Sequence, residues 1–400
     1  MSAVVVHYGE LALKGRNRAW FLSTLVKSIR STLKGLGVRD VRSVIGRIIV
    51  NLGPTADWPE IRERLRFVPG ITNFSYSEEV DADIEVMSGR IVAALAGQSA
   101  PSFRVKVRRA DKRFTTPSPD VERVIGRRVQ EATGWRVDLS NPALVIKVEV
   151  LSTNAFFSFG SEKGTGGLPV GTGGRVMALM SGGIDSPVAA WRLIRRGCRA
   201  DFVHFHSYPI LSRASQDKAR ELVAQLTRFQ LRSRLHLVPF GGIQQQIVLA
   251  VPPALRVVIY RRFMLRIAER LARKAGAHAL VTGDAVAQVA SQTLENLAVV
   301  GSVATLPLLR PLVGMDKEEI TADAQKIGTY GVSILTDEDC CTLFTPRFPS
   351  TRTSFAEVED AERALDVDGI VTAAVAAAQL EQFGFPMLQS QAFAGKEGAE

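Results

Sequence analysis

The residues best suited to chemistry lie in one short stretch, Ser181-Gly-Gly-Ile-Asp-Ser186. The apolar run at 175–180 precedes it and an amphipathic stretch starting at Pro187 follows, which predicts a buried strand, a tight loop and a helix. Proline is tolerated in the first turn of a helix because the N–H that it lacks would have no intrahelical partner there. Glycines let the backbone approach an anion, and a helix N-terminus presents N–H groups to it. The stretch therefore predicts a phosphate site with four candidate donors: Ser181, Gly182, Gly183 and Ser186. An ordinary glycine turn is the alternative.

Asp185 needs a different role, because a carboxylate is a poor partner for phosphate. It could coordinate Mg²⁺ or align the loop, or it could simply cap the following helix. The loop lacks the Gly-Lys-Ser/Thr ending of a Walker loop, so a kinase-like grip on a γ-phosphate is not indicated.

The chain beyond residue 172 alternates strand and helix patterns, which predicts a doubly wound α/β domain with a parallel sheet. Expected strands are 175–180, 200–205, 233–238 and 278–282; expected helices are 187–196, 215–229, 254–275 and 316–326. Ligands of such sheets bind at the carboxyl ends of the strands, which is where the loop would lie.

The first 162 residues read as two smaller α/β units, 1–56 and 57–162. Strands are expected at 3–7, 44–52, 71–79, 102–108, 143–150 and 155–159, and helices at 20–33, 58–66, 83–96 and 119–133. The glycine-rich stretch 163–174 is expected to be a flexible connection, 175–390 the third domain and 391–400 a frayed tail.

Basic residues are concentrated between positions 104 and 113, in a chain of formal charge +10. If 102–108 is a strand, alternate side chains point the same way, so Arg104, Lys106 and Arg108 share one face. Such a face suits a nucleic-acid backbone. A solvated edge strand protected by its charges is the alternative. The candidate RNA contacts are Arg104, Lys106, Arg108, Arg109, Lys112 and Arg113.

Bulk properties exclude several classes of protein. The sequence has no run of 18 apolar residues and its N-terminus has no signal-peptide pattern, so we expect a cytoplasmic protein that does not enter a membrane. Three cysteines cannot build a disulfide framework, and the spacing of zinc ligands is absent. Cys340 and Cys341 are adjacent, so their Cα atoms lie about 3.8 Å apart, too close for an ordinary disulfide. Cys198 is expected to be a structural thiol.

Four segments carry a resemblance to one family: 8–18 (YGELALKGRNR), the loop 181–187, 282–297 (TGDAVAQVASQTLENL) and 339–346 (DCCTLFTP). The loop resembles the PP-loop of ATP pyrophosphatases, and the whole chain resembles the tRNA 4-thiouridine synthetases, or tRNA sulfurtransferases, in the form without a rhodanese domain. The resemblance implies an N-terminal ferredoxin-like domain, a tRNA-binding THUMP domain and a PP-loop catalytic domain.

The family reaction, as the resemblance implies it, adenylates uridine 8 of tRNA with ATP and Mg²⁺, and a cysteine persulfide then replaces the C4 oxygen with sulfur. Cys340 matches the persulfide position and Lys317 a family lysine, although a surface lysine at a helix start is the alternative. Cys341 either assists or is inert. The adenosine contacts carried over are Leu179, Met180, His204, Phe205, Arg261, Gly283 and Gln292.

We further expect a cysteine desulfurase as sulfur donor, and a homodimer is one option for the oligomeric state, which the sequence does not determine. The resemblance adds a second role that the family can have, sulfur supply for thiamine thiazole synthesis. Two rival readings stay open: a PP-loop ligase that couples adenylation to an amine, and a non-catalytic RNA-binding protein.

Overall fold

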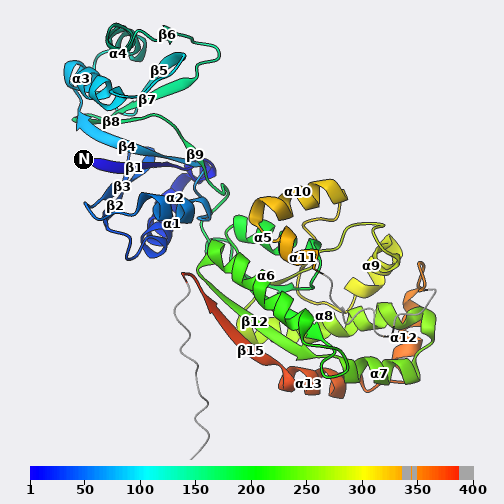
Figure 1. Ribbon diagram of the computed structural model, residues 1–400. Helices are drawn as coiled ribbons and strands as arrows, with labels where there is room; N and C mark the ends of the chain where they lie inside the picture. The colour runs from blue at the N-terminus through cyan, green and yellow to red at the C-terminus, as the bar shows by residue number, and fades with distance from the viewer. Residues whose placement is uncertain (336–343, 345–348, 387–400) are drawn as a thin grey trace, which may run out of the picture. The chain divides into compact units, whose positions relative to one another are not determined.

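The structure is a computed structural model that describes residues 1–335, 344 and 349–386 (Figure 1). It divides into two compact units, Met1–Pro169 and Val170–Glu400.

Unit 1 is built on one nine-stranded sheet with the order β2-β3-β1-β4-β8-β7-β5-β6, and β9 pairs with β4 off this path. Its strands are β1 (Ser2–His7), β2 (Val38–Val44), β3 (Arg47–Leu52), β4 (Asn73–Asp81), β5 (Ser102–Arg109), β6 (Arg136–Val137), β7 (Leu144–Val150), β8 (Asn154–Ser158) and β9 (Glu162–Lys163). The single strand predicted at 44–52 is wrong in its first residues, because Val44 ends β2, the chain turns at Ile45-Gly46, and it runs back as β3. Gly46 has φ +75°, which a tight hairpin turn requires.

Four α-helices pack on this sheet and form two apolar cores. The helices of unit 1 are α1 (Arg18–Thr32), α2 (Trp58–Arg66), α3 (Ile84–Leu95) and α4 (Ser118–Thr133), with short 3-10 helices η1 (Glu10–Leu13) and η2 (Gly15–Asn17). Asp57 and Asp83 cap α2 and α3 by accepting bonds from backbone N–H groups of the first turn. The first core joins α1 to β1 and β3, and it includes Ile61 and Leu65 of α2. It therefore extends past residue 56, where the sequence placed the end of the first domain.

The opposite face of the sheet holds a buried ion pair. Arg47 of β3 is 1% exposed and pairs with Glu149 of β7, and the other carboxylate oxygen of Glu149 lies 2.6 Å from His7 Nε2. Burial works to raise the pKa of Glu149, but His7, Arg47 and Arg108 hold it below its ordinary value. Because β1, β4 and β8 separate β3 from β7 in the strand order, a flat sheet would keep the pair about 19 Å apart. The sheet therefore curls, and the pair joins its two halves.

The glycine-rich stretch 163–174 is bonded along its length. Gly164 and Gly166 donate to the carbonyls of Thr72 and Ile71 in unit 1, at 3.0 and 2.7 Å, while Gly171 and Gly173 both donate to Gly197 in unit 2. The division between the units falls between these pairs, after Pro169.

Unit 2 is a doubly wound α/β domain, as predicted. Its six strands follow the order β14-β13-β10-β11-β12-β15. They are β10 (Arg175–Leu179), β11 (Arg199–His206), β12 (Arg232–Pro239), β13 (Ala279–Val281), β14 (Leu308–Leu309) and β15 (Gln379–Gly384). The first five run parallel, and β15 is antiparallel to β12.

Helices cover both faces of this sheet (Figure 1). They are α5 (Asp185–Arg195), α6 (Ala214–Gln230), α7 (Gly241–Ala250), α8 (Arg256–Ala275), α9 (Leu294–Gly301), α10 (Lys317–Ile327), α11 (Tyr330–Ser333), α12 (Phe355–Glu362) and α13 (Val367–Ala377), with 3-10 helices η3 (Pro253–Leu255) and η4 (Ala290–Gln292). The helices α5 and α6 pack on one face and α8 and α13 on the other. Among the described residues, none of the helices is long and apolar enough to cross a membrane.

The long helix α8 is the central helix on the face of the sheet that α8 and α13 cover. Most of its residues are buried, and Arg262, 3% exposed, forms an ion pair with Glu362 of α12, which also pairs with Arg266. Two arginines on one buried carboxylate compensate its charge and tie α12 to the body of the unit.

Candidate nucleotide and RNA sites

The loop Ser181–Ile184 joins the carboxyl end of β10 to the N-terminus of α5, as predicted. Ser186 is 5% exposed and closes the loop from inside: its Oγ accepts from the Ser181 N–H at 3.0 Å and lies 3.1 Å from Ser181 Oγ. The Gly183 N–H points back to Ser181 Oγ at 3.3 Å. Ser186 thus shapes the loop, while Ser181 and Gly183 lie at its exposed surface.

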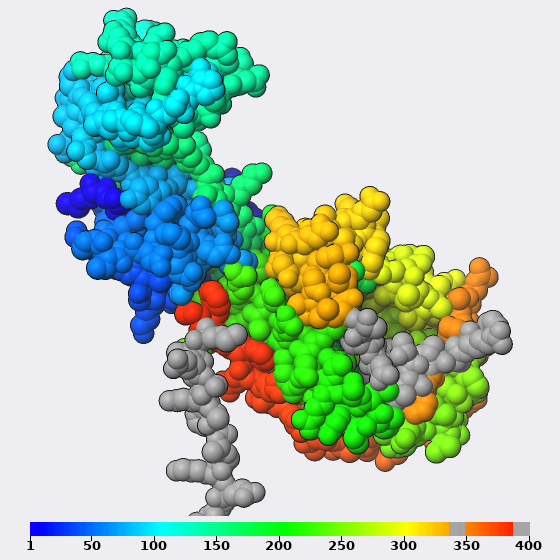
Figure 2. Space-filling view, in the orientation of Figure 1, coloured from blue at the N-terminus to red at the C-terminus, as the bar shows by residue number. Residues whose placement is uncertain are grey.

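Asp185 is the first residue of α5, and the helix has no side-chain cap. Its Oδ1 accepts from Lys317 Nζ at 3.0 Å and its Oδ2 from Gln288 Nε2 at 2.9 Å. The carboxylate therefore faces the neighbouring loops and does not cap its own helix. Lys317 does begin a helix, α10, on the surface of the unit, where Figure 2 shows that helix in gold. The structure thus brings both predicted catalytic side chains of the described residues together.

Gly283 follows β13 and lies directly against the loop. A Cβ at this position would meet the Ser186 backbone nitrogen at 2.8 Å and the Asp185 carbonyl carbon at 2.9 Å. Real Cβ contacts essentially never come this close. Only glycine allows the end of β13 to pack against the first turn of α5.

The next residue, Asp284, collects four donors around one buried carboxylate. Arg261 and Gln292 donate to its Oδ1, the latter at 3.3 Å, while Thr282 and Arg310 donate to its Oδ2 at 2.7 and 3.3 Å. Burial works to raise the pKa of Asp284, but Arg261, Thr282 and Arg310 hold it below its ordinary value. The carboxylate is therefore charged and holds two arginines beside the loop.

A cavity of about 30 Å³ lies beside this cluster, with Leu179, Arg261, Thr282 and Asp284 among its lining residues. That volume matches one water molecule.

Three of the expected adenosine contacts are core side chains. Met180, His204 and Phe205 are 3%, 2% and 5% exposed. His204 Nδ1 lies 2.9 Å from the Met180 carbonyl oxygen and its Nε2 lies 3.4 Å from Ser215 Oγ. His204 thus bonds to the chain after β10 and to α6, and the side chains of all three residues are buried.

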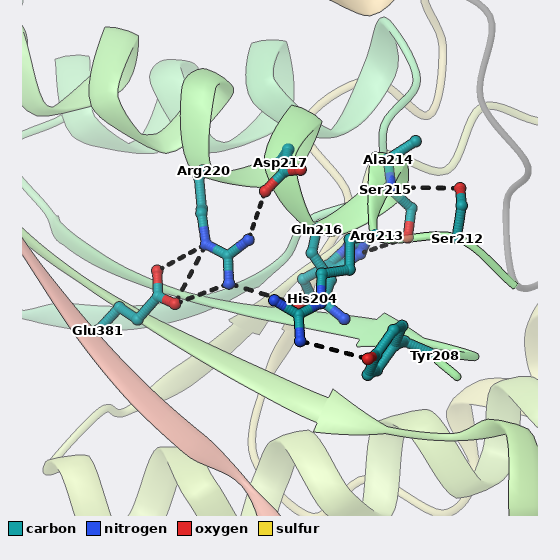
Figure 3. A network of polar contacts seen from close by, with 10 residues as sticks. All are labelled: His204, Tyr208, Ser212, Arg213, Ala214, Ser215, Gln216, Asp217, Arg220 and Glu381. Atoms are coloured by element: carbon teal, nitrogen blue, oxygen red, sulfur yellow. Dashed lines mark hydrogen bonds and ion pairs between the residues drawn. The ribbon is translucent and has the colours of Figure 1, made fainter. Parts of the chain in front are cut away.

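Polar contacts gather on α6 and on the connection that precedes it (Figure 3). Arg220 is bonded to Asp217 at 2.6 Å and to both carboxylate oxygens of Glu381 on β15. Arg213 lies 4.6 Å over the ring of Tyr208 and donates to its hydroxyl. The first set of contacts ties α6 to β15, and the second lies within the connection 207–213 between β11 and α6.

The strand β5 in unit 1 has one cationic face, as its alternation predicts. Lys106 and Arg108 are exposed and Arg104 is half-buried, whereas Val105 and Val107 point into the core. The sequence analysis missed a neighbour: Lys147 of β7 lies in register with Lys106. Burial, with Lys106 nearby, lowers the pKa of Lys147. The pattern of β7 could have revealed it, since Lys147 alternates with buried Ile146 and Val148.

The remaining basic candidates differ in how they are held. Arg113 forms a bidentate bond to Asp111, at 2.9 and 2.6 Å, and Arg109 donates to the carbonyls of Phe114 and Thr115. Lys112 is exposed. These bonds order the loop after β5. Arg104 is held in the same way, because its Nη1 donates to the Leu139 carbonyl oxygen at 2.8 Å, whereas Lys106 and Arg108 are the exposed basic side chains of the cationic face.

The structure describes one of the three cysteines, Cys198. Cys198 is buried, its thiol lies 3.3 Å from the Gly173 carbonyl oxygen, and burial raises the pKa of that thiol, which suits a structural role. Cys340 and Cys341 lie outside the described residues. Ser333 of α11 contacts the phosphate loop, since its Oγ lies 3.5 Å from the Gly183 carbonyl oxygen.

Four polar residues of the site were not singled out from the sequence: Thr282, Asp284, Gln288 and Arg310. Three of them lie inside the segment 282–297 that carries the family resemblance, so that segment could have pointed to them. Their roles depend on contacts with α8, α5 and β14, which no local pattern reveals.

Comparisons with known proteins find relatives along the whole chain. Three family profiles match consecutive parts of the chain: the ThiI ferredoxin-like domain at residues 3–75, the THUMP domain at 82–159 and the thiamine biosynthesis protein (ThiI) at 171–367. A probable tRNA sulfurtransferase of Thermus thermophilus is 47% identical over 379 residues, covering 95% of this chain and 93% of the relative. One from Brevibacillus brevis is 43% identical over 383 residues, covering 95% and 96%.

A solved structure of a 4-thiouridine synthetase in complex with RNA and bound ATP superposes with a TM-score of 0.86 at 33% identity, covering 96% of this chain and 100% of that one. The PH1313 protein of Pyrococcus horikoshii shares the fold, with a TM-score of 0.63 at 24% identity and coverage of 82% and 100%. On this evidence the chain belongs to the tRNA sulfurtransferase family.

Proposed function

We propose that this protein is an ATP-dependent tRNA sulfurtransferase that forms 4-thiouridine. The observation that carries the proposal is the loop Ser181–Ser186 at the strand ends, with Asp185 and Lys317 paired above it, in a chain that aligns along its length with an ATP- and RNA-bound 4-thiouridine synthetase.

ATP is bound across the ends of β10, β11 and β13. The backbone of Gly182 and Gly183, together with Ser181, receives the phosphates at the N-terminus of α5. Lys317 offsets negative charge at the α-phosphate. Arg261, Gly283 and Gln292 form the nucleoside side of the site.

Mg²⁺ fits this site without a dedicated cage. Mg²⁺ is commonly held by one or two carboxylates and the substrate's own phosphates. Asp185 supplies one carboxylate, 22% exposed, and no group of three metal-ligating side chains occurs among the residues that the structure describes. When bound, the ion would neutralise charge on the phosphates.

The proposed reaction has two steps. The C4 oxygen of uridine 8 attacks the α-phosphorus, the bond between the α-phosphorus and the bridging oxygen breaks, and pyrophosphate leaves. The terminal sulfur of a persulfide on Cys340 then attacks C4, and AMP leaves with the former C4 oxygen. Cleaving the S–S bond takes two electrons from a second thiol, for which Cys341 and an external thiol are the candidates.

The tRNA is bound by unit 1, through the cationic face formed by Arg104, Lys106 and Arg108. Arg109, Lys112 and Arg113 flank that face. The sulfur comes from a cysteine desulfurase, the protein acts in the cytoplasm as a homodimer, and the same persulfide also supplies thiamine thiazole synthesis. Thiamine auxotrophy of cells that lack the protein tests the last point.

The decisive experiment combines purified protein, unmodified tRNA, ATP, cysteine and a cysteine desulfurase, with 4-thiouridine measured by nucleoside mass spectrometry. We expect Cys340→Ala to lose 4-thiouridine but to keep tRNA-dependent pyrophosphate release. Cys341→Ala leaves the nucleophile in place, so it tests separately whether Cys341 or an external thiol cleaves the S–S bond.

Other outcomes favour the rival functions. A Cys340→Ala variant with full activity would indicate an adenylating ligase. Tight tRNA binding by the wild-type protein, with neither pyrophosphate release nor product, would indicate a non-catalytic RNA-binding protein.

A further inference from the structure

We propose that Asp284 is a positioning residue for ATP, which fixes Arg261 and Gln292 beside the phosphate loop. The inference rests on the proposed function for the identity of the nucleotide. It concerns a residue that would not itself contact ATP.

The two oxygens of Asp284 serve different partners. Its Oδ1 accepts from Arg261 and Gln292, both of which are expected nucleoside contacts. Its Oδ2 accepts from Thr282, at the end of β13, and from Arg310, after β14. One oxygen therefore anchors the carboxylate to the sheet, and the other orients the side chains that face the nucleotide.

The far ends of both arginines are also held. Arg261 Nη1 donates to the Ser291 carbonyl at 2.7 Å, and Arg310 Nη2 donates to the Leu297 carbonyl at 3.1 Å. Asp284 is 4% exposed, and the side chains of Arg261 and Arg310 are 18% and 22% exposed. The cluster thus joins α8, η4 and two strand ends around a carboxylate that solvent hardly reaches.

The charges of this cluster suit an anionic ligand. One carboxylate between two guanidinium groups leaves one positive charge in excess among the three. The backbone of the preceding residue, Gly283, lies against the nitrogen of Ser186 in the loop. The excess charge is therefore held close to where the phosphates are expected.

A purely structural role is the alternative, and unit 2 contains a matched example of one. Asp201, near the start of β11, is 2% exposed and accepts from Arg175 at 2.9 Å and from Arg234 at 2.6 Å. It is also a buried aspartate between two arginines. It lies at the end of its strand opposite to the loop, so it has no route to the nucleotide.

The test compares Asp284→Asn with Asp201→Asn in the full-length protein. The probe is an ATP analogue with a methylene group between the α- and β-phosphates, which cannot be cleaved there, and its Kd is measured by calorimetry. We expect Asp284→Asn to weaken binding about tenfold or more, as the loss of a charge-assisted contact does, and Asp201→Asn to change it less than about twofold. Binding of tRNA without nucleotide should be unchanged in both variants.

Thr282→Val is the second variant and decides the case if Asp284→Asn does not fold. It keeps the shape of the side chain and removes only the 2.7 Å bond to Asp284. We expect a several-fold rise in Kd and in the KM for ATP, with little change in the KM for tRNA. Wild-type affinity in a folded Asp284→Asn or in Thr282→Val, or equal weakening by Asp201→Asn, would overturn the inference.

The two proposals fail separately. If the wild-type protein binds the analogue with dependence on Asp284 but never forms 4-thiouridine, the proposed function is wrong and the role of Asp284 stands. If 4-thiouridine forms and the variants keep the wild-type KM for ATP, the function stands and the role of Asp284 is wrong.

Discussion

Replacing Gly283 by alanine tests the contact between β13 and the phosphate loop. The added Cβ would lie 2.8 Å from the Ser186 nitrogen and 2.9 Å from the Asp185 carbonyl carbon. Ordinary van der Waals contact begins near 3.4 Å, so the neighbours must separate by about half an ångström. Both atoms belong to the backbone of the first turn of α5, which cannot rotate away as a side chain could.

The cost follows from this geometry. Gly283 does not have a positive φ, so alanine is acceptable to the backbone and the penalty is steric. Overpacking of this kind costs about 1–3 kcal/mol. A displacement of about half an ångström at Asp185 also misaligns the catalytic groups. We therefore expect kcat to fall about 10- to 100-fold.

The assay measures 4-thiouridine formation and thermal unfolding of Gly283→Ala beside Gly242→Ala. Gly242 lies in α7 with no atom within 4 Å of its added Cβ, so alanine there should stabilise the protein by about 0.5–1 kcal/mol and leave turnover unchanged. Wild-type values of kcat and of KM for ATP in Gly283→Ala would refute the reasoning. They would mean that the end of β13 shifts to make room for the added Cβ while the phosphate loop keeps its position.

Three further predictions concern charged groups. Lys317→Ala should lower the rate of tRNA-dependent pyrophosphate release at least about tenfold, because it removes the cation 3.0 Å from Asp185. Its tRNA affinity in a gel-shift assay should not change. An unchanged rate would mean that Lys317 is a surface lysine without a catalytic role. Glu149→Gln should destabilise unit 1 by about 3–5 kcal/mol in urea unfolding, because it leaves Arg47 buried and unpaired. The control is Arg90→Ala, which breaks an exposed ion pair and should cost less than about 1 kcal/mol. Equal losses of stability in the two variants would contradict the prediction. Burial, with His204 and Arg220, lowers the pKa of His206 to about 4 from 6.5. Between these pH values the unfolded chain therefore binds more protons than the folded one. The contribution of His206 to stability is present above pH 6.5 and is lost as the pH falls towards 4, by up to about 3 kcal/mol. His206→Gln should flatten the dependence of unfolding free energy on pH in that range, and an unchanged slope would contradict the assignment.

Most helices and strands could be predicted because their signals are local. The helix 58–66 was predicted at its observed bounds, since Asp57 caps it and Pro59 lies in its first turn. The elements that were missed have weaker signals. The strand β15 has little apolar content and pairs with the edge of the sheet at β12. The helix α9 begins at Leu294, and its N-cap, Thr293, lies within a segment that was read only as a motif.

The candidate site also has a part that local sequence predicts and a part that depends on distant contacts. The loop Ser181–Ser186 could be recognised in the sequence because its glycines, hydroxyls and following helix are contiguous. The resemblance added Arg261, Gly283 and Gln292 as separate contacts, without what connects them. The connection is Asp284, which accepts from two of them.

The sequence by itself determined the order of the elements, the phosphate loop and the cationic alternation of β5, because each depends on neighbours within a few residues. Only the tertiary structure decided which distant charges meet. Asp185 receives Lys317 from 132 residues away, and Arg47 reaches Glu149 across three intervening strands because the sheet curls. A buried charge needs a partner wherever the fold can supply one, and that partner's place in the chain leaves no local pattern.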